Sequence, residues 1–445
     1  PEARKNTYIS SEADWITFET TVSTAGDQTA IAPGYLQKQW QQEGRNYFHY
    51  KMDQKMLNFY AYNSARYEVK REKWNNLNLE IYYHKGHEYN LDRMMEAMKK
   101  SLAYYSENFG EYQHKQARII EFPRTMGTFA QAFANTMPFS EAIGFIADVD
   151  EDDPNGVDYP FSVVSHEMAH QWWAHQVIGA NVKGATLLSE SLSEYSSLKV
   201  LEKEYGKFQM RKFLKDALDG YLQGRTFEWK EENPLMYNEN QQYIHYNKGS
   251  LVLYAMSDFM GEKLFNDILK SYVAKVKFQE APYTNSIEFV NHLKEHTPAQ
   301  YQYLINDMFE TITLYDNKVD EVKVTPLKDG TYQVDISFIV SKYKTGPKGD
   351  QLYTDASGKT LLGKEGSKDV KSYPMQDFVE IGVFGEKILK GKHEYENELY
   401  NKKYLINKVN NKVRIIVDKK PFEVGVDPYN KLIDRNSNDN RKKVD

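Results

Sequence analysis

The sequence predicts an α+β protein with a β-rich first part, a mainly helical middle and a C-terminal β-sandwich. Near the start of the chain, apolar and polar residues alternate over residues 77–83, as in a half-buried strand. The middle of the chain instead spaces its apolar residues at helical intervals, and period two returns after about residue 318. The boundaries that follow are a β-rich segment at 1–88, a helical domain at 89–317, a sandwich at 318–434 and a polar tail at 435–445.

Composition is typical of a soluble globular protein. The chain has 445 residues, enough for several domains, of which 40% are hydrophobic and 27% charged. A net charge of −6 gives no reason to expect a nucleic-acid partner, and the lack of Cys excludes disulfides and thiol chemistry. No apolar run in the sequence reaches the length of a membrane span. The chain begins with Pro1, so we expect a piece of a longer polypeptide.

Several local elements can be placed from the sequence. A helix is expected between an N-cap at Asn90 and a stop at Gly110, with Met and aromatic residues on its buried face. Residues 141–149 look like a strand, and helices are expected after Tyr195 with breaks at Gly220 and Gly224. Strands of the sandwich are expected at residues 332–340 and 413–417, and the polar tail is expected to be disordered.

Residues 166–170 carry the chemistry-bearing motif of the chain, His-Glu-Met-Ala-His. Residues four apart share one face of a helix, so His166 and His170 can hold one zinc ion while Glu167 faces a water on an open coordination position. Apolar neighbours such as Val164 and Trp173 fit a helix whose back lies in a core.

A second segment, residues 187–195, supplies carboxylates at helical spacing. Leu188, Leu192 and Tyr195 make an apolar stripe, which leaves Glu190 and Glu194 together on another face. A catalytic zinc site with two His needs a third protein ligand, and we assign that role to Glu190. Glu194 is then placed to accept a hydrogen bond from a ligating His. The alternative is that both are solvated surface acids.

These segments resemble the zinc signature of the M1 aminopeptidases, which are gluzincins with a thermolysin-like catalytic domain. The resemblance is carried by His-Glu-Met-Ala-His-Gln-Trp-Trp at 166–173 and Ser-Glu-Ser-Leu at 189–192. It implies a thermolysin-like fold for residues 89–317 and makes residues 1–88 the end of a saddle-shaped β-domain, the rest of which is missing from the sequence.

Two further matches concern the substrate. Tyr246 opens Tyr-Asn-Lys-Gly, which is similar to the family's Tyr-x-Lys-Gly motif, whose Tyr steadies the oxyanion; Tyr243 and His245 are neighbouring substitutes. Glu141 corresponds to the family's Glu that grips the substrate's free amino group, for which the alternative is a surface acid. Two departures stand out: nineteen residues rather than eighteen separate His170 from Glu190, and Ser140 and Ala142 replace Met and Asn beside Glu141.

The resemblance implies a zinc-dependent metallopeptidase with one Zn²⁺, most simply an aminopeptidase acting on peptides with a free N-terminus. Bound zinc polarises the scissile carbonyl and lowers the pKa of a water, while Glu167 acts as general base. The alternatives are a zinc endopeptidase and a catalytically silent peptide-binding or sensor domain.

The variant of the signature, with Gln-Trp-Trp after His170 and Leu-Ser-Glu-Ser-Leu around Glu190, is similar to M1-like domains fused to ABC-type permease subunits in bacteria. This likeness implies an extracytoplasmic part of a longer membrane protein, whose membrane-embedded remainder is the partner. A cytoplasmic location is the alternative.

Overall fold

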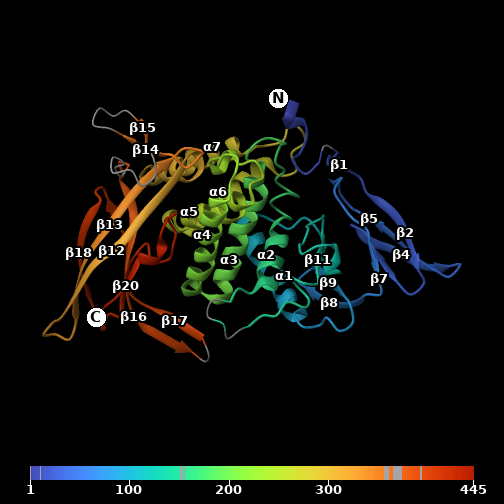
Figure 1. Ribbon diagram of the computed structural model, residues 1–445. Coiled ribbons are helices and arrows are strands. Elements are labelled where there is room, and N and C mark those ends of the chain that lie inside the picture. Colours follow the sequence, from blue (N-terminus) through green and yellow to red (C-terminus); the bar gives the residue numbers. More distant parts are fainter. Residues whose placement is uncertain are drawn as a thin grey trace. The chain divides into compact units, whose positions relative to one another are not determined.

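The computed structural model describes residues 2–10, 12–150, 153, 156–354, 360–363, 373–390 and 393–444, and these residues contain both helices and sheets (Figure 1). The chain divides into two compact units. The first consists of residues 1–151, 156–201 and 262–292, and the second of residues 152–155, 202–261 and 293–445. The predicted α+β class is therefore confirmed, with each unit combining strands and helices.

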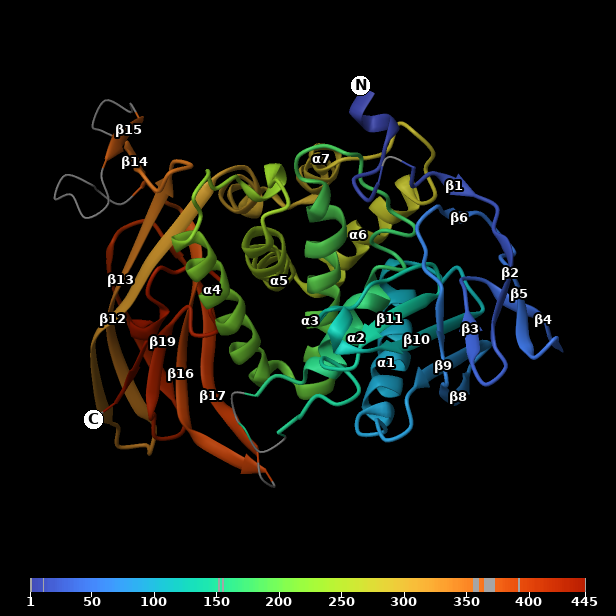
Figure 2. The same ribbon diagram turned by 45° about the vertical axis from the view of Figure 1, so that its right-hand side comes forward.

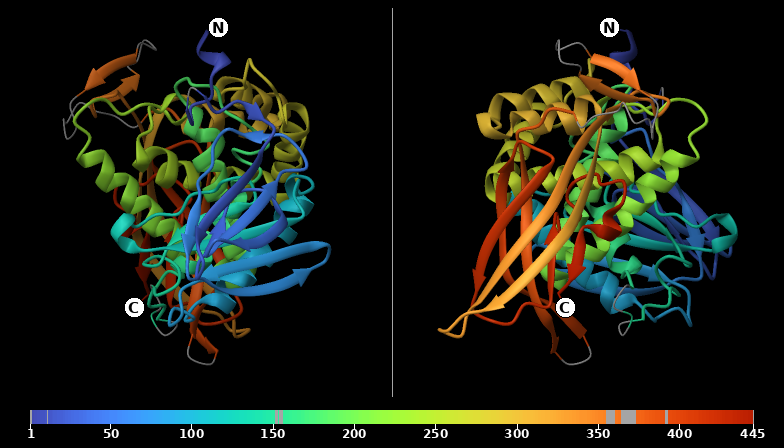
Figure 3. Two further views of the ribbon diagram at one scale, coloured as in Figure 1. Left: turned by 90° about the vertical axis from the view of Figure 1, so that its right-hand side faces the viewer. Right: turned by 60° about the vertical axis from the view of Figure 1, so that its left-hand side comes forward.

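The first unit begins with small antiparallel sheets, drawn in blue in Figure 3. Aromatic side chains such as Phe18, Phe48 and Tyr50 form a core beneath them. The sheets pair β1 (Trp15–Ile16) with β6 (Met56–Leu57), β2 (Glu19–Ala25) with β5 (Arg45–Lys51) and β4 (Tyr35–Gln42), and β3 (Thr29–Ile31) with β7 (Asn63–Ala65).

A four-stranded sheet follows in the order β11-β10-β9-β8. Its strands β9, β10 and β11 run parallel, and β8 pairs antiparallel with β9. The parallel step from β9 to β10 needs a crossover, which helix α1 (Leu91–Phe109) supplies. The predicted boundary at residue 88 thus falls between strands of one sheet. The strands are β8 (Glu68–Trp74), β9 (Leu77–Tyr83), β10 (Gln116–Phe122) and β11 (Thr136–Ser140).

Helix α1 confirms the limits predicted from Asn90 and Gly110, and it packs against β9, α2 and α6 (Figure 2). Its Met94, Met98 and Tyr105 are fully buried, so the Met stripe is core. The other helical segments that include residues of this unit are α2 (Tyr159–Ala169), η3 (Leu187–Ser191), α3 (Leu192–Tyr205), α6 (Glu262–Val276) and α7 (Ser286–His296).

The strand predicted at residues 141–149 is wrong, because β11 ends at Ser140 and residues 141–146 form turns. The apolar residues of this segment are held by tertiary contacts instead of the hydrogen bonds of a β-sheet. Asn90 Nδ2 donates hydrogen bonds to the carbonyls of Gly144 (2.7 Å) and Ala147 (2.8 Å). A Cβ at Gly144 would lie 2.6 Å from the Phe139 ring, so only glycine allows this approach.

The second unit contains helix α4 (Met210–Thr226), which runs without interruption through Gly220 and Gly224. The breaks predicted at these glycines are therefore wrong. A Cβ at Gly224 would lie 2.3 Å from Cβ of Tyr243, so the glycine lets the segment η6 (Tyr243–Lys248) approach α4 closely. Further helical segments of this unit are α5 (Gly249–Met260), α8 (Gln302–Ile305) and η8 (Asn306–Glu310).

Two β-sheets form the C-terminal part of the second unit, seen in orange and red in the right panel of Figure 3. The predicted strands at 332–340 and 413–417 are confirmed as parts of β13 and β18, which pair antiparallel. One sheet contains β12 (Ile312–Pro326), β13 (Tyr332–Thr345), β14 (Gln351–Thr354), β15 (Thr360–Gly363) and β18 (Asn410–Val417), and the other contains β16 (Asp377–Lys390), β17 (His393–Ile406), β19 (Glu423–Val426) and β20 (Arg441–Lys443).

The disorder predicted for the polar tail is wrong, because β20 pairs antiparallel with β19. Arg441 explains the order: its guanidinium is buried and donates to both carboxylate oxygens of Glu396 (3.0 and 2.9 Å), and it lies 2.7 Å from Glu423 Oε2. A bidentate pair of this kind holds the chain against the sheet.

Short 3₁₀ turns connect the larger elements: η1 (Glu2–Lys5), η2 (Arg124–Met126), η4 (Lys207–Gln209), η5 (Leu235–Tyr237), η7 (Ala299–Tyr301) and η9 (Ser437–Asp439). Among the described helices, none combines the length and the apolar composition needed to cross a bilayer.

Candidate metal centre

Helix α2 carries the His-Glu-Met-Ala-His motif. Its first turn is fixed by the N-cap Asp158, whose side chain accepts a hydrogen bond from the backbone N–H of Phe161 (2.9 Å). His166 and Glu167 lie near the end of the helix, and His170 is its C-cap residue. All three residues are buried, with exposed fractions of 6–7%. The sequence predicted a core only for the back of this helix, so the burial of the three motif residues themselves is an added finding.

The chain beyond α2 is anchored by three residues that follow His170. Trp172 and Trp173 are fully buried, and Trp173 Nε1 donates to Ser196 Oγ of α3 (2.9 Å). Gln171 Oε1 accepts from the backbone N–H of Asn135, next to β11 (2.9 Å). The end of α2 is therefore fixed both to α3 and to the parallel sheet, which limits the movement of His170.

Glu190 comes from η3, a π-helical turn that leads directly into α3. Turns of this kind are frequent at functional sites. Glu190 Oε2 lies 3.3 Å from Nε2 of His166 and 3.4 Å from Nε2 of His170. The three residues that the sequence analysis assigned as metal ligands therefore converge on one point.

These separations fit a zinc ion. Ligands about 2.0–2.1 Å from a tetrahedral ion lie about 3.3–3.4 Å from each other, which is the spacing between Glu190 Oε2 and the two imidazole nitrogens. Two imidazoles and one carboxylate form a donor set typical of catalytic zinc. The residues present are thus a zinc-binding set.

The far nitrogens of both imidazoles have partners. His166 Nδ1 lies 2.9 Å from Glu194 Oε1, and His170 Nδ1 lies 3.0 Å from the carbonyl oxygen of Trp173 and 3.1 Å from Ser193 Oγ. Contacts like these fix the tautomer and the ring orientation of a metal-binding His, leaving Nε2 for the metal.

Glu167 is a buried carboxylate with an unsatisfied oxygen. Its Oε2 is buried and meets no hydrogen-bond donor among the described residues. Burial raises the pKa of Glu167, although the imidazoles of His170 and His166 act in the opposite direction. A buried carboxylate with a raised pKa is suited to taking up a proton and passing it on.

The ligand residues themselves form an ion-paired cluster. Burial opposes the charge on His166, but the carboxylates of Glu194 and Glu190 outweigh it and hold the pKa of His166 well above its usual value. Burial also acts against the charge on Glu190, yet His170 and His166 keep the pKa of Glu190 well below its usual value. The carboxylate is thus charged, as a metal ligand must be.

Tyr8 is a neighbour of this cluster that sequence reasoning missed. Burial, and then the charge of Glu190, raise the pKa of Tyr8, and its hydroxyl interacts with Ser189. Its backbone N–H donates to the carbonyl of Gly179 (3.4 Å). Tyr8 lies in an irregular N-terminal segment with no motif around it, so no pattern in the sequence marks it.

Glu141 follows β11 directly, and its own surroundings differ from those of the metal ligands. Its Oε1 accepts a hydrogen bond from the backbone N–H of Arg124 (3.1 Å), and its Oε2 lies 3.8 Å from Nδ1 of His87. Its side chain is largely buried. The amine-binding role implied by the resemblance stays a prediction.

Tyr246 belongs to the second compact unit, in the π-helical segment η6 before α5. Its ring lies 4.4 Å from the His245 ring, and Gly220 of α4 makes room for the side chain of the next residue, Asn247. The two helix glycines thus fix η6 against α4. The oxyanion role of Tyr246 stays a prediction.

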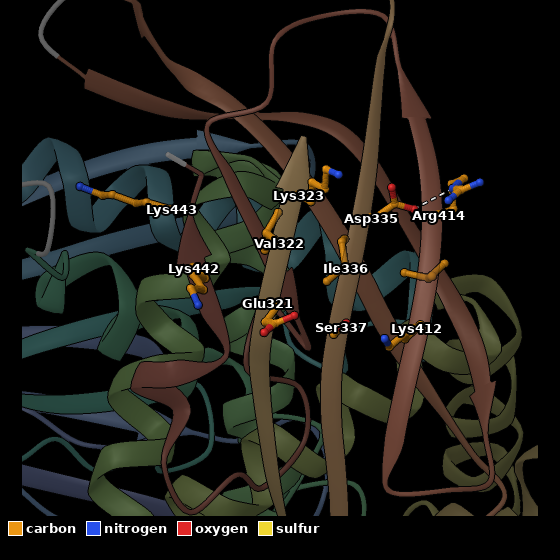
Figure 4. A pocket seen from close by; sticks show the side chains of 11 residues that line it. Glu321, Val322, Lys323, Asp335, Ile336, Ser337, Lys412, Arg414, Lys442 and Lys443 are labelled. Atoms are coloured by element: carbon orange, nitrogen blue, oxygen red, sulfur yellow. Dashed lines mark hydrogen bonds and ion pairs between the residues drawn. The ribbon is translucent and has the colours of Figure 1, made fainter. Parts of the chain in front are cut away.

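A separate hollow of about 700 Å³ lies over the C-terminal sheet formed by β12, β13 and β18 (Figure 4). Its lining holds charges of both signs, and Asp335 accepts from Arg414 there (2.7 Å). Among the described residues no histidine lines it, so its lining there differs from the cluster on α2 and η3. The lining residues are Glu321, Val322, Lys323, Asp335, Ile336, Ser337, Lys412, Val413, Arg414, Lys442 and Lys443.

Comparison with known proteins identifies the middle of the chain. Residues 93–311 match the model of the Peptidase family M1 domain. A probable aminopeptidase 1 from Sulfurisphaera tokodaii is 25% identical over 199 residues, which cover 42% of this chain and 24% of that protein. The matched range contains α2, η3 and η6, where the predicted zinc ligands, the general base and Tyr246 lie.

Solved structures show the same fold. An M1 zinc metallopeptidase mutant from Deinococcus radiodurans, bound to a Tyr-Ser-Ala substrate, matches with a TM-score of 0.51 at 16% identity, over 67% of this chain and 64% of that chain. Legionella pneumophila aminopeptidase A matches with a TM-score of 0.59 at 14% identity, over 94% of this chain and 44% of that chain. The chain spans less than two-thirds of the length of each of these three proteins. Residues 93–311 of this chain are thus similar to a Peptidase family M1 domain.

Proposed function

We propose that this chain is a zinc-dependent metallo-aminopeptidase that hydrolyses the first peptide bond of substrates with a free N-terminus. The observation that carries the proposal is the convergence of His166, His170 and Glu190, with separations of 3.3 and 3.4 Å at the Glu190 oxygen. The matched Peptidase family M1 domain supports a hydrolase of this class.

Each residue near α2 has a distinct role in the proposal. His166, His170 and Glu190 hold one zinc ion, which when bound polarises the scissile carbonyl and acidifies a water molecule. Glu167 takes a proton through its unsatisfied Oε2 and passes it to the leaving amine. Glu194 keeps the His166 ring in the orientation that directs Nε2 towards the metal.

Two residues outside this cluster complete the assignment. Glu141 binds the cationic amino group of the substrate by charge-assisted hydrogen bonds, which selects free N-termini. The Tyr246 hydroxyl donates a hydrogen bond to the oxyanion as charge develops in the transition state. The tripeptide bound by the Deinococcus protein is a substrate of the size that this assignment expects.

The test combines zinc content with hydrolysis of aminoacyl reporter amides and of their N-acetylated twins. We expect one catalytic zinc ion, cleavage of the free amines only, and loss of cleavage in Glu167→Gln with the zinc retained at that site. Glu194→Gln, assayed with zinc in excess, serves as the matched control, because it removes a nearby carboxylate that takes no proton from the reaction.

The other outcomes overturn the proposal in different ways. Equal cleavage of the blocked and free amides would identify a zinc endopeptidase. Zinc binding with no turnover of either set would identify a peptide-binding or sensor domain. Undiminished cleavage of the free amides by the zinc-loaded Glu167→Gln variant would remove that residue from the role of general base.

We further propose that the chain is the extracytoplasmic part of a longer polypeptide that contains an ABC-type permease subunit. The support is the signature variant around His170 and Glu190. Accessibility of the domain to an added protease in intact cells and in lysed cells tests this location. Protection in intact cells from which the outer envelope has been removed would place the domain in the cytoplasm instead.

A further inference from the structure

A tight turn at the end of β9 brings two histidines together. The backbone N–H of His87 donates to the carbonyl of His84 (3.0 Å), and Gly86 between them has φ +96°. A turn with positive φ at its third residue favours glycine there, so the local sequence fixes this geometry. The His84 and His87 imidazoles consequently lie at the two ends of one turn, with ring centroids 6.1 Å apart.

A buried carboxylate on the neighbouring strand faces both rings. Glu121 lies on β10 and its side chain is 0% exposed. Its Oε2 accepts from the backbone N–H of His84 (2.5 Å) and lies 3.3 Å from His84 Nδ1, while its Oε1 contacts His87 Nδ1. Burial of an ionised carboxylate is unfavourable unless a cation or several donors offset it.

A second carboxylate adjoins the group. Glu141 Oε2 lies 3.8 Å from His87 Nδ1. Arg124 lies beside Glu141, with its Nε 3.9 Å from Glu141 Oε1 and its side chain mostly exposed to solvent. Two carboxylates and two imidazoles therefore meet at the end of the parallel sheet, with the exposed guanidinium of Arg124 beside them.

We propose that His84, His87 and Glu121 form a second site for a divalent transition-metal ion of the zinc class, with Glu141 next to it. The ligand atoms of the three residues lie within 4.8 Å of one another. Imidazole nitrogen and carboxylate oxygen are ligands that zinc accepts, and the site shares no residue with the cluster of His166, His170 and Glu190.

The distances from Glu121 to the two imidazoles indicate how a metal ion would bind. The 3.3 Å between His84 Nδ1 and Glu121 Oε2 is the spacing of two ligands on one tetrahedral ion. His87 Nδ1 lies closer to Glu121 than that, so its ring moves outward when the ion binds. The side chains of His84 and His87 are 33% and 29% exposed, which leaves room for this movement and a path from solvent.

The first test counts metal ions. The whole chain is equilibrated with Zn²⁺, freed of excess by gel filtration and analysed by mass spectrometry of the elements. We expect two zinc ions per chain in the unaltered protein and one after the double change His84→Gln, His87→Gln. The double change His166→Gln, His170→Gln should also leave one, since the two sites are separate. The His49→Gln control should keep two, because His49 pairs with the single carboxylate of Glu19.

A single zinc ion in the unaltered protein that His84→Gln, His87→Gln leaves in place would overturn the proposal. Retention of two ions in that variant would do the same, because the second ion would then lie elsewhere. Neither result bears on the proposed peptidase activity, which is measured separately with the reporter amides.

The second test needs no variant and so does not depend on the folding of one. Diethylpyrocarbonate modifies accessible imidazoles, and peptide mass spectrometry shows which histidines react. His49 is 28% exposed and therefore matches His84 and His87 in access. We expect Zn²⁺ to protect His84 and His87 while His49 stays reactive. Equal modification of all three with and without Zn²⁺ would reduce the group to a hydrogen-bonded cluster and overturn the proposal.

Discussion

Each compact unit has a cluster of buried carboxylates, and the cluster around Lys431 balances its charge differently from the cluster around Glu167 and Glu190. In the second unit, Lys431 is buried with its Nζ 2.8 Å from Asp258 Oδ1 and 2.8 Å from Glu380 Oε1. Burial opposes the charge on this lysine, yet Glu380 and Asp258 outweigh it and raise the pKa of Lys431 to about 12. The charges of these two carboxylates are therefore offset by Lys431, a residue that stays positively charged.

In the first unit, Glu167 and Glu190 instead face imidazoles. The interactions that shape the pKa of Glu167 come, after burial, from His170, His166 and other carboxylates. Imidazoles carry at most one charge each and lose it when they bind a metal, so the acids remain in excess. Of these two clusters of described residues, the one whose negative charge is not offset by a lysine or arginine is the candidate metal centre. A bound metal cation would supply the missing positive charge there.

The substitution Glu167→Gln should have the largest effect on this comparison. Removing a general base lowers kcat by up to about 10⁴-fold. Because burial of this acid is unfavourable in the fold, the free energy of unfolding of the metal-free protein should stay the same or rise. Steady-state hydrolysis and urea denaturation of the same preparation measure both quantities. If the variant lost stability together with activity, Glu167 would be needed to hold the fold, and the loss of activity would not show that it acts as general base.

The substitution Lys431→Met should show the opposite pattern. It keeps the length of the side chain but leaves Glu380 buried without its cation, which costs about 3–5 kcal/mol of stability. Hydrolysis by the fraction that remains folded should be unchanged. Urea denaturation provides the measurement. The double change Lys431→Met, Glu380→Gln is the control and should recover much of the loss, because no unpaired charge remains buried. Equal stability of the single variant and the unaltered protein would contradict the role assigned to this ion pair.

The substitution Tyr246→Phe tests whether the second unit contributes chemistry as well as stability. Loss of one donor to the oxyanion lowers kcat by about 10²–10³-fold, while KM and zinc content change little. Tyr243→Phe is the matched control, since the Tyr243 hydroxyl donates to Glu228 Oε2 (3.2 Å). A loss in the Tyr243 variant with no loss in the Tyr246 variant would reverse the assignment.

Much of the metal centre could be predicted because its signal is local. His166 and His170 are one helical turn apart, so periodicity places them on one face of a helix, and the need of a zinc site for a third ligand points to Glu190 in the next segment. The cluster of His84, His87 and Glu121 has no such signal. Its carboxylate lies on the next strand of a parallel sheet, and only the pairing of β9 with β10 brings it to the turn.

The elements that were predicted wrongly share a cause of the same kind. Residues 141–149 are apolar enough for a strand, but Asn90 takes up the carbonyls of Gly144 and Ala147 that a ladder would need. The tail is polar enough for disorder, but the buried guanidinium of Arg441 donates a hydrogen bond to Glu396 and so holds the tail in place. In both cases the hydrogen-bond partner is a side chain that is distant in the sequence, so no local sequence pattern could have predicted it.

The substitution Glu194→Gln should have the smallest effect and marks the edge of the functional cluster. The Glu194 carboxylate contacts His166 Nδ1 at 2.9 Å, so it acts on the metal only through the ring. Loss of its charge should weaken zinc binding about 10–100-fold. With zinc in excess, kcat should stay close to that of the unaltered protein. Competition with a fluorescent chelator measures the affinity. If the variant bound zinc as tightly as the unaltered protein, Glu194 would have no role in the metal centre. If its kcat fell at saturating zinc, Glu194 would take part in the reaction in addition to orienting His166.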